Sequence, residues 1–245
     1  MSQKGLKLAV KYSYRPFILG FCGPQKNQYH KILTNYLLGD KIKNDVIESI
    51  LRQFVGAFPY YVLIAWKNKI KDVFDHRVVE AYWLGNSLLY KVKRQDIGVM
   101  IIAYFLRLGW IDMKRAKEII GLMPKGVKPH HTFHVFFMGS VTDTIQIKGK
   151  TVDNCRIGWG QVTKLKKDKL SVKTNPLKTK PKLKLSAKKE INLAHEINFT
   201  QKIKKREIVS YHWGMVVDKI NKRQQNNLEK YTKLNLKLYN ASQKK

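Results

Sequence analysis

The periodicity of apolar residues changes once along this 245-residue chain, and that change limits what it can fold into. Over residues 25–123 apolar side chains recur every three or four positions, which is the spacing of amphipathic helices. After the proline-bracketed segment Pro124–Pro129, short runs rich in aromatic and β-branched residues alternate with polar ones, as strands do. The change predicts an α+β protein in which a helical domain precedes a β domain.

The helical domain is expected to span residues 25–123 and to follow an extended N-terminal segment, residues 1–24. The Gly23-Pro24 step at the end of that segment breaks regular structure. Gly39 is placed to cap the C-terminus of a first helix. Asp75 and Asp112 are placed to cap the N-termini of two later helices.

The β domain is expected over residues 130–212, as a small OB-like antiparallel β-barrel. Strands are predicted at 130–137, 141–147, 151–157, 182–185 and 207–212. Beyond Cys155 the alternation of apolar and polar residues continues through Val162 and Leu165 to a turn at 167–169, and then through Leu170 and Val172. Short strands that follow one another at this spacing, without intervening helices, indicate a small closed barrel. A long C-terminal helix, residues 213–241, is expected to pack on the barrel because its apolar residues follow a helical stripe.

The formal net charge of +31 makes weak, non-specific binding to polyanions at low salt an expected property. The densest basic block, Lys164–Lys189, contains lysine and no arginine. Arginine would be the better sign of specific recognition of phosphates or bases. A nucleic-acid-binding protein working through this block is therefore one alternative function. Alternation of lysine with leucine over 182–185 also fits a half-buried strand with a solvated outer face.

The chain has two cysteines, Cys22 and Cys155, and this does not support a disulfide framework. We therefore expect a cytoplasmic protein in a reducing compartment. The longest apolar run, residues 97–106, is too short to cross a bilayer, and no membrane span is predicted.

Cys155 and His212 are the leading candidates for a functional site. Each lies close to glycine in a stretch expected to be a strand, and each offers a ligand that suits a transition metal, a thiolate and an imidazole. The predicted barrel lies between them in sequence and could bring them together. The alternative is structural, with Cys155 a buried strand residue and His212 a hydrogen-bonded core histidine.

A secondary site is considered at His130, His131 and His134, with Glu80 and Cys22. If residues 130–137 form a strand, His130 and His134 share a face but lie about 13 Å apart, at about 3.3 Å per residue. Two such histidines cannot bind one ion alone, because metal–nitrogen bonds are about 2 Å long. The second alternative function is an enzyme with a His-rich cleft in which Glu80 acts as an acid or base. The structural alternatives are that Glu80 pairs with His76 on a helix surface and that Cys22 occupies a buried apolar position.

The C-terminal part resembles the small chaperones that assemble nickel–iron hydrogenases. In that family a cysteine precedes a Pro-Gly-x-Val turn, and a later His-x-Gly-x-Ala strand end precedes a C-terminal helix. Here Cys155 is followed by Gly160 and Val162 at similar spacing, and residues 212–217 resemble the second motif. Trp159 stands where the family has proline, and the cysteine is internal rather than next to the initiator methionine.

This resemblance covers about 85 residues and implies a non-enzymatic metal-centre assembly factor. It implies that Cys155 and His212 hold an iron-dicyanide-carbonyl group in transit, with maturation proteins and a hydrogenase large-subunit precursor as partners. Over its full length the chain also resembles an uncharacterised bacterial family of unknown function. The segments that carry that second resemblance are Cys-Gly-Pro at 22–24, Val-Val-Glu-Ala-Tyr-Trp at 78–83, His-His-x-Phe-His at 130–134 and Cys-Arg-Ile at 155–157.

Overall fold

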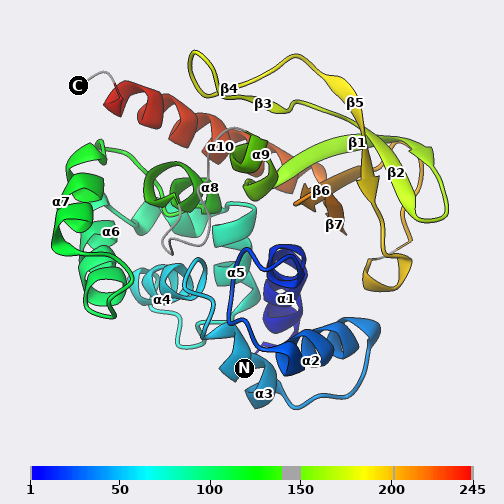
Figure 1. The fold of residues 1–245 in the computed structure, drawn as a ribbon, viewed down its shortest axis with the longest axis horizontal. Coiled ribbons are helices and arrows are strands. Elements are labelled where there is room, and N and C mark those ends of the chain that lie inside the picture. The colour runs from blue at the N-terminus through cyan, green and yellow to red at the C-terminus, as the bar shows by residue number, and fades with distance from the viewer. Residues whose placement is uncertain (1, 140–149, 201, 244–245) are drawn as a thin grey trace.

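A computed structural model describes residues 2–139, 150–200 and 202–243 and shows an α+β protein, as predicted. Helices form the N-terminal half, and a five-stranded barrel with a small two-stranded sheet follows (Figure 1). The helices before the barrel are α1 (Gln3–Ile18), α2 (Asn27–Leu38), α3 (Asn44–Leu51), α4 (Phe58–Lys67), α5 (His76–Trp83), η1 (Ser87–Lys91), α6 (Arg94–Met100), η2 (Ile101–Leu106), α7 (Met113–Leu122), α8 (His131–Phe133), η3 (His134–Met138) and α9 (Lys150–Cys155).

The capping predictions for the helical region are confirmed. Gly39 ends α2 in the left-handed conformation, at a φ of 108°. The side chain of Asp75 accepts a hydrogen bond from the backbone N–H of Arg77 at the start of α5, and Asp112 does the same for Arg115 at the start of α7. These signals act within one helical turn, and for this reason they could be read without the tertiary fold.

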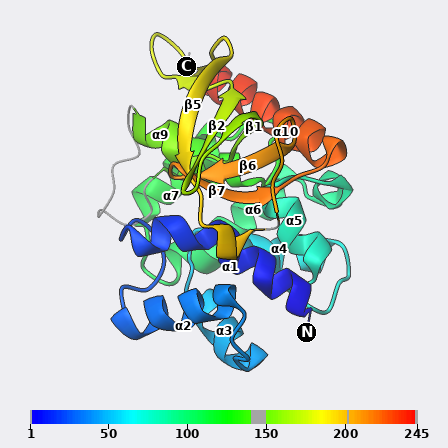
Figure 2. The same ribbon diagram turned by 90° about the vertical axis from the view of Figure 1, so that its right-hand side faces the viewer.

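The prediction of an extended N-terminal segment is wrong, because residues 3–18 form α1. Ser2 caps this helix by accepting a hydrogen bond from the backbone N–H of Gly5. The helix buries Leu6, Val10 and Phe17. Figure 2 shows α1 between the barrel on one side and α2 and α3 on the other, so it joins the two halves of the molecule.

Two predicted strands are also wrong. Residues 131–138 form α8 and η3, and residues 150–155 form α9. Every residue from His130 to Met138 is buried. The run therefore has no exposed polar residues whose spacing could distinguish a strand from a helix. The strand predicted at 141–147 lies outside the described residues.

The barrel is formed by β1 (Gly158–Leu165), β2 (Lys169–Thr174), β5 (Lys189–Ala194), β6 (Ile208–His212) and β7 (Met215–Lys219). These strands are hydrogen-bonded in the closed order β1-β2-β5-β7-β6. All neighbours are antiparallel except β5 and β7, which are parallel. The barrel interior is an apolar cluster that includes Leu170, Val172, Val209 and Val216. The predicted small barrel is therefore present, with one parallel pair in place of a fully antiparallel sheet.

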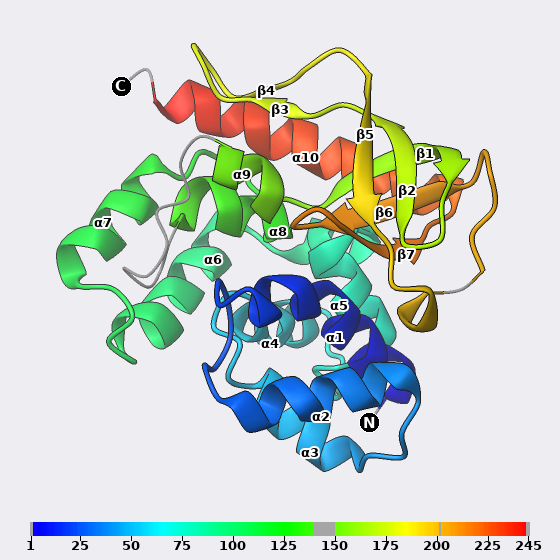
Figure 3. The same cartoon turned by 45° about the vertical axis from the view of Figure 1, so that its right-hand side comes forward.

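The chain ends in α10 (Lys222–Ser242), which begins later than predicted because β7 occupies residues 215–219. We expected this helix to pack on the barrel. Its contacts with the helical region are also specific, because the buried Asn235 donates to the Thr132 hydroxyl in α8 and Tyr231 donates to the carbonyl of Asn86. In Figure 3 α10 runs beside α8, α9 and the hairpin of β3 (Leu177–Lys178) and β4 (Lys184–Leu185). Among the described helices, none combines the length and apolar character needed to cross a membrane.

Candidate metal centre

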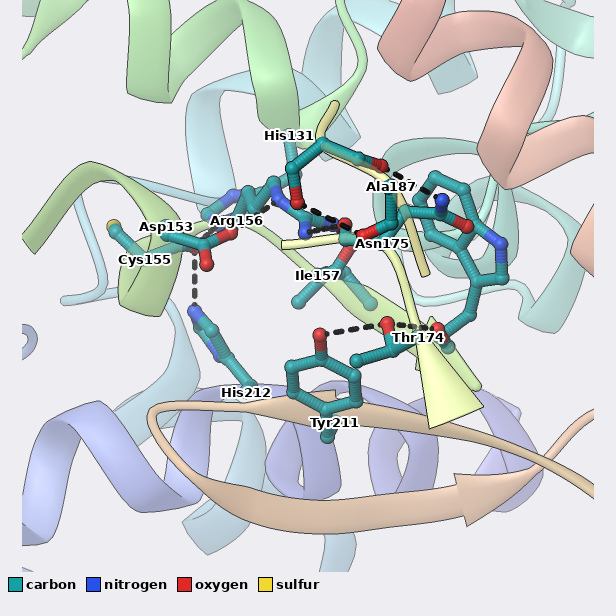
Figure 4. A network of polar contacts seen from close by, with 12 residues as sticks. His131, Asp153, Cys155, Arg156, Ile157, Thr174, Asn175, Ala187, Tyr211 and His212 are labelled. Atoms are coloured by element: carbon teal, nitrogen blue, oxygen red, sulfur yellow. Dashed lines mark hydrogen bonds and ion pairs between the residues drawn. The ribbon is translucent and has the colours of Figure 1, made fainter. Parts of the chain in front are cut away.

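His131, Cys155 and His212 meet where the helical region adjoins the barrel. They come from three elements: the first turn of α8, the end of α9 and the last residue of β6. A ligand atom from each of the three lies within 4.8 Å of the ligand atoms of the other two. Figure 4 shows the His212 ring pointing from β6 toward Cys155. The structure thus brings together the two leading candidates and adds one histidine from the run at 130–134.

Both ring nitrogens of His212 face backbone carbonyls. Nδ1 lies 2.8 Å from the carbonyl oxygen of Tyr12 in α1, and Nε2 lies 2.8 Å from the carbonyl oxygen of Cys155. A carbonyl oxygen only accepts hydrogen bonds, whereas a neutral imidazole carries one N–H. The neutral ring can therefore satisfy one of these two contacts and not both.

His131 is held in a similar way. Its Nδ1 lies 2.9 Å from the hydroxyl oxygen of Tyr82, and that hydroxyl donates to the carbonyl of Gly56. With its single proton directed at Gly56, the Tyr82 oxygen accepts from Nδ1–H of His131. The Nε2 atom of His131 then presents a lone pair to the carbonyl oxygen of Cys155, 2.8 Å away.

Five contacts link these groups, and each needs one proton between two electron-pair donors. Two neutral imidazoles and one tyrosine hydroxyl supply three protons, so two contacts are left without one. Protonated rings would supply the two missing protons, but burial lowers the pKa of His131 and His212 and keeps both rings neutral. Both shortfalls are then resolved if His131 and His212 keep their protons on Nδ1 and a cation lies near the two Nε2 atoms. Metal-binding histidines show this pattern, in which the second ring nitrogen donates to a carbonyl or another oxygen.

Cys155 is fixed by its neighbours in sequence. Arg156 is almost fully buried, and its guanidinium group contacts the carboxylate of Asp153 at 2.7 Å and the carbonyl of Asn175 at 2.8 Å (Figure 4). The backbone N–H of Trp213 donates to the carbonyl of Asn154. Because these bonds tie α9 to the barrel and to the β6–β7 turn, Cys155 and His212 are held in one arrangement.

Burial sets the protonation states of the three groups. The pKa of the Cys155 thiol is raised to about 12, chiefly by burial and to a smaller extent by the nearby Cys22, against an opposing hydrogen bond with Trp213. Burial lowers the pKa of His212 to about 4. The pKa of His131 is also well below its usual value, first through burial and then through the nearby His212 and His134. At neutral pH the thiol is protonated and the rings are neutral, so a metal ion would displace a proton from Cys155.

A pocket of about 520 Å³ opens beside the three side chains. Its walls combine loops from both halves of the molecule, including Phe21 and Cys22 after α1, Gly56 before α4, Trp110 after η2, and Trp213 in the β6–β7 turn. The rings of Phe21 and Trp213 stack with centroids 3.9 Å apart. The size lies within the range of small-molecule sites.

The remaining residues considered for the secondary site separate into two groups. His134 and Cys22 line the pocket, although neither belongs to the three-residue cluster. His130 and Glu80 do not line it. The Nδ1 of His130 accepts from the backbone N–H of Thr132, and Glu80 accepts hydrogen bonds from Asn86 and Gln224. Glu80 therefore fastens α10 to α5, and the cleft predicted to contain all five residues does not form.

Sequence reasoning missed the partners that orient the two histidines. Tyr12 is 200 residues away from His212 in sequence, and Tyr82 is 49 residues away from His131. Tyr82 lies in the segment that carried the full-length family resemblance, but nothing in its local pattern indicates a contact with histidine. Only the packing of α1 and α5 against the barrel and α8 reveals these contacts.

The chain belongs to a family of unknown function, DUF6390, whose model matches residues 1–245. This confirms the full-length resemblance predicted from the sequence. No curated protein and no solved structure matches the chain.

Proposed function

We propose that the protein binds one transition-metal ion through Nε2 of His131, Nε2 of His212 and Sγ of Cys155. The observation that carries this proposal is the proton shortfall, since five contacts share three protons. A divalent cation can accept the electron pairs that no proton satisfies. Two imidazoles and one thiolate suit iron, zinc or copper rather than magnesium or calcium, which prefer oxygen ligands. Three protein ligands also leave a coordination position open, as in catalytic zinc sites.

The surroundings support a resident ion that acts on a small molecule. His131 and His212 are 4% and 1% exposed, and each is fixed through Nδ1 by a residue of another helix. Ligands held this firmly do not need to reorganise when an ion binds, and their release of an ion is expected to be slow. The adjoining pocket gives a substrate or ligand access to the open position.

The metal-centre assembly role is a narrower form of the same proposal. It adds that the ion is iron in an iron-dicyanide-carbonyl group and that maturation proteins and a hydrogenase precursor are the partners. It rests on the resemblance of residues 155–162 and 212–217 to hydrogenase chaperones. It predicts rapid transfer of iron to a partner, whereas a resident ion exchanges slowly. Nucleic-acid binding through Lys164–Lys189 stays an alternative prediction.

The proposal is tested by metal analysis of purified protein after reconstitution with iron, zinc, cobalt or copper, under anaerobic conditions for iron. We expect one ion per chain in the wild type and at least a thousandfold weaker binding in Cys155→Ala, His131→Gln and His212→Gln. Cys22→Ala is the matched control, because Cys22 lines the same pocket outside the ligand set and should leave binding unchanged. Circular dichroism checks that each variant is folded.

Equal metal content in the wild type and in folded His212→Gln would contradict the proposal, as would a wild type that takes up none of these ions. For the assembly role, the protein is co-expressed with hydrogenase-maturation partners and its infrared spectrum is recorded. Cyanide and carbonyl bands that disappear in Cys155→Ala would support that role. A metal-loaded protein without such bands, and with slow loss of metal to a chelator, would restrict the function to a resident ion.

A further inference from the structure

The pocket beside the candidate metal centre is lined by permanently charged groups of positive sign only, among the described residues. Among its described lining residues no aspartate or glutamate occurs, and Arg52 is the permanently charged group. Arg52 is already paired with Glu48, which its Nε contacts at 2.8 Å. A divalent ion bound by one thiolate and two neutral imidazoles carries a net charge of about +1. The strongest attraction in the pocket is therefore for one negative charge placed at the ion.

The walls away from the three ligands are apolar and partly aromatic. Phe21 and Trp213 form one stacked pair, and Trp83 and Trp110 supply two further indole rings. Phe21 and Trp110 are each 37% exposed, so part of this aromatic surface is open rather than packed in the core. Such walls bury the flat, apolar body of a ligand better than a chain of hydroxyl or amine groups.

His134 adds a directional polar group. Its Nδ1 lies 3.1 Å from the hydroxyl oxygen of Tyr60, and its ring centroid lies 6.3 Å from that of His131. If the Tyr60 hydroxyl donates to Nδ1, the neutral ring carries its proton on Nε2. A Cβ atom at Gly56 would lie 3.2 Å from this Nε2, so a side chain at that position would crowd the edge of the ring that lines the pocket. His134 can thus donate a hydrogen bond into the pocket next to the ion.

We infer that the pocket binds a small monoanion with a flat apolar body, of the class of aromatic carboxylates. One oxygen of the anion takes the open coordination position, the anion accepts a hydrogen bond from Nε2–H of His134, and the apolar body lies against Phe21 and Trp110. This inference rests on the proposed metal site and extends it by naming the class of ligand. His134 is assigned as a ligand-binding residue that does not hold the ion.

The test uses full-length protein loaded with Co²⁺, whose visible absorption reports on a new ligand at the ion. Three probes are titrated: phenylacetate, which has both features; acetate, which lacks the apolar body; and benzylamine, which carries the opposite charge. We expect phenylacetate to change the cobalt spectrum and to bind at least tenfold more tightly than acetate. Benzylamine should leave the spectrum unchanged at the same concentrations.

Two variants separate the contributions of the walls and of the hydrogen bond. Trp110→Ala should weaken phenylacetate binding about tenfold and leave acetate binding unchanged, because only the apolar body contacts that wall. His134→Phe should weaken both anions without lowering the cobalt content. His195→Gln is the control, since His195 bonds to the Thr200 hydroxyl and does not line the pocket.

The outcomes distinguish this inference from the proposal beneath it. Cobalt-loaded protein that binds benzylamine as tightly as phenylacetate, or that binds none of the probes, would overturn the ligand class while leaving the metal site intact. Reduced cobalt content in folded His134→Phe would overturn the role given to His134, because it would place that side chain among the ligands. A wild type that binds no cobalt, zinc, iron or copper would overturn both.

Discussion

The barrel interior and the junction of α8, α9 and the β6–β7 turn are both buried, but they bury opposite kinds of side chain. The barrel interior holds apolar residues such as Leu170, Val172 and Val209. The junction holds His131, Cys155 and His212 together with orienting hydroxyl and carbonyl groups. Apolar burial stabilises the fold and leaves no chemical group to react. A buried polar group without a hydrogen-bond partner is costly unless a ligand satisfies it, and for this reason we propose that the protein functions through the junction.

The largest effect expected from this comparison is loss of stability in acid, which the junction and its surroundings should cause. Burial lowers the pKa of His134 and His212 to about 4 and that of His130 to about 3, and it lowers the pKa of His131 as well. Their unfolded pKa is about 6.5, so the unfolded chain binds more protons below that pH. The stabilisation is complete above pH 6.5 and is lost as pH falls toward 4.

In metal-free protein we expect the free energy of unfolding to fall by up to about 5 kcal/mol between pH 7.5 and 5.5, from four histidines at about 1.4 kcal/mol per pH unit each. Urea unfolding at a series of pH values measures this. His195→Gln is a control outside the cluster, because that ring is only partly buried and should account for a small part of the slope. A free energy of unfolding that stays constant over this range would show that the buried rings do not resist protonation.

The next effect concerns the barrel alone. Leu170 is fully buried inside it, whereas Leu165, its partner across β1 and β2, is 49% exposed. Leu170→Ala should lower the free energy of unfolding by about 2–5 kcal/mol through lost burial and a cavity, and Leu165→Ala by less than about 0.5 kcal/mol. Metal content of the folded Leu170→Ala protein should equal that of the wild type. A drop in metal content would mean that the barrel interior and the junction are coupled.

The sequence predicted the secondary structure of the barrel better than that of the junction. Alternation of apolar and polar residues predicted the barrel strands that have one solvated face, and short-range signals at Gly39, Asp75 and Asp112 predicted helix ends. The fully buried run at 130–138 has no solvated face, so it was assigned to a strand instead of α8 and η3. That error hid the proximity of His131 and His134, which a helix places one turn apart.

The pairing of Cys155 with His212 was predicted from motif order and is reproduced as proximity in the structure, although Cys155 ends a helix rather than lying on a strand. The third residue of the cluster, His131, was considered only for a separate site. Its place depends on the packing of α8 against α9 and β6, which no local pattern encodes.

The smallest effect expected concerns the hydrogen bond behind His131 and its contribution to metal affinity. Tyr82→Phe removes the hydroxyl that receives Nδ1–H of His131, while Tyr60→Phe removes the equivalent hydroxyl beside His134. Loss of a partner behind a metal ligand typically weakens metal binding 10–100-fold, or about 1.4–2.7 kcal/mol. We therefore expect that loss for Tyr82→Phe and unchanged metal affinity for Tyr60→Phe, measured by competition with a chelator of known affinity.

The two tyrosines stack on each other with ring centroids 4.9 Å apart, so both variants disturb the same core. Equal losses in the two would mean that His131 is held by packing rather than by its hydrogen bond, and the tautomer assigned to it would lose its support.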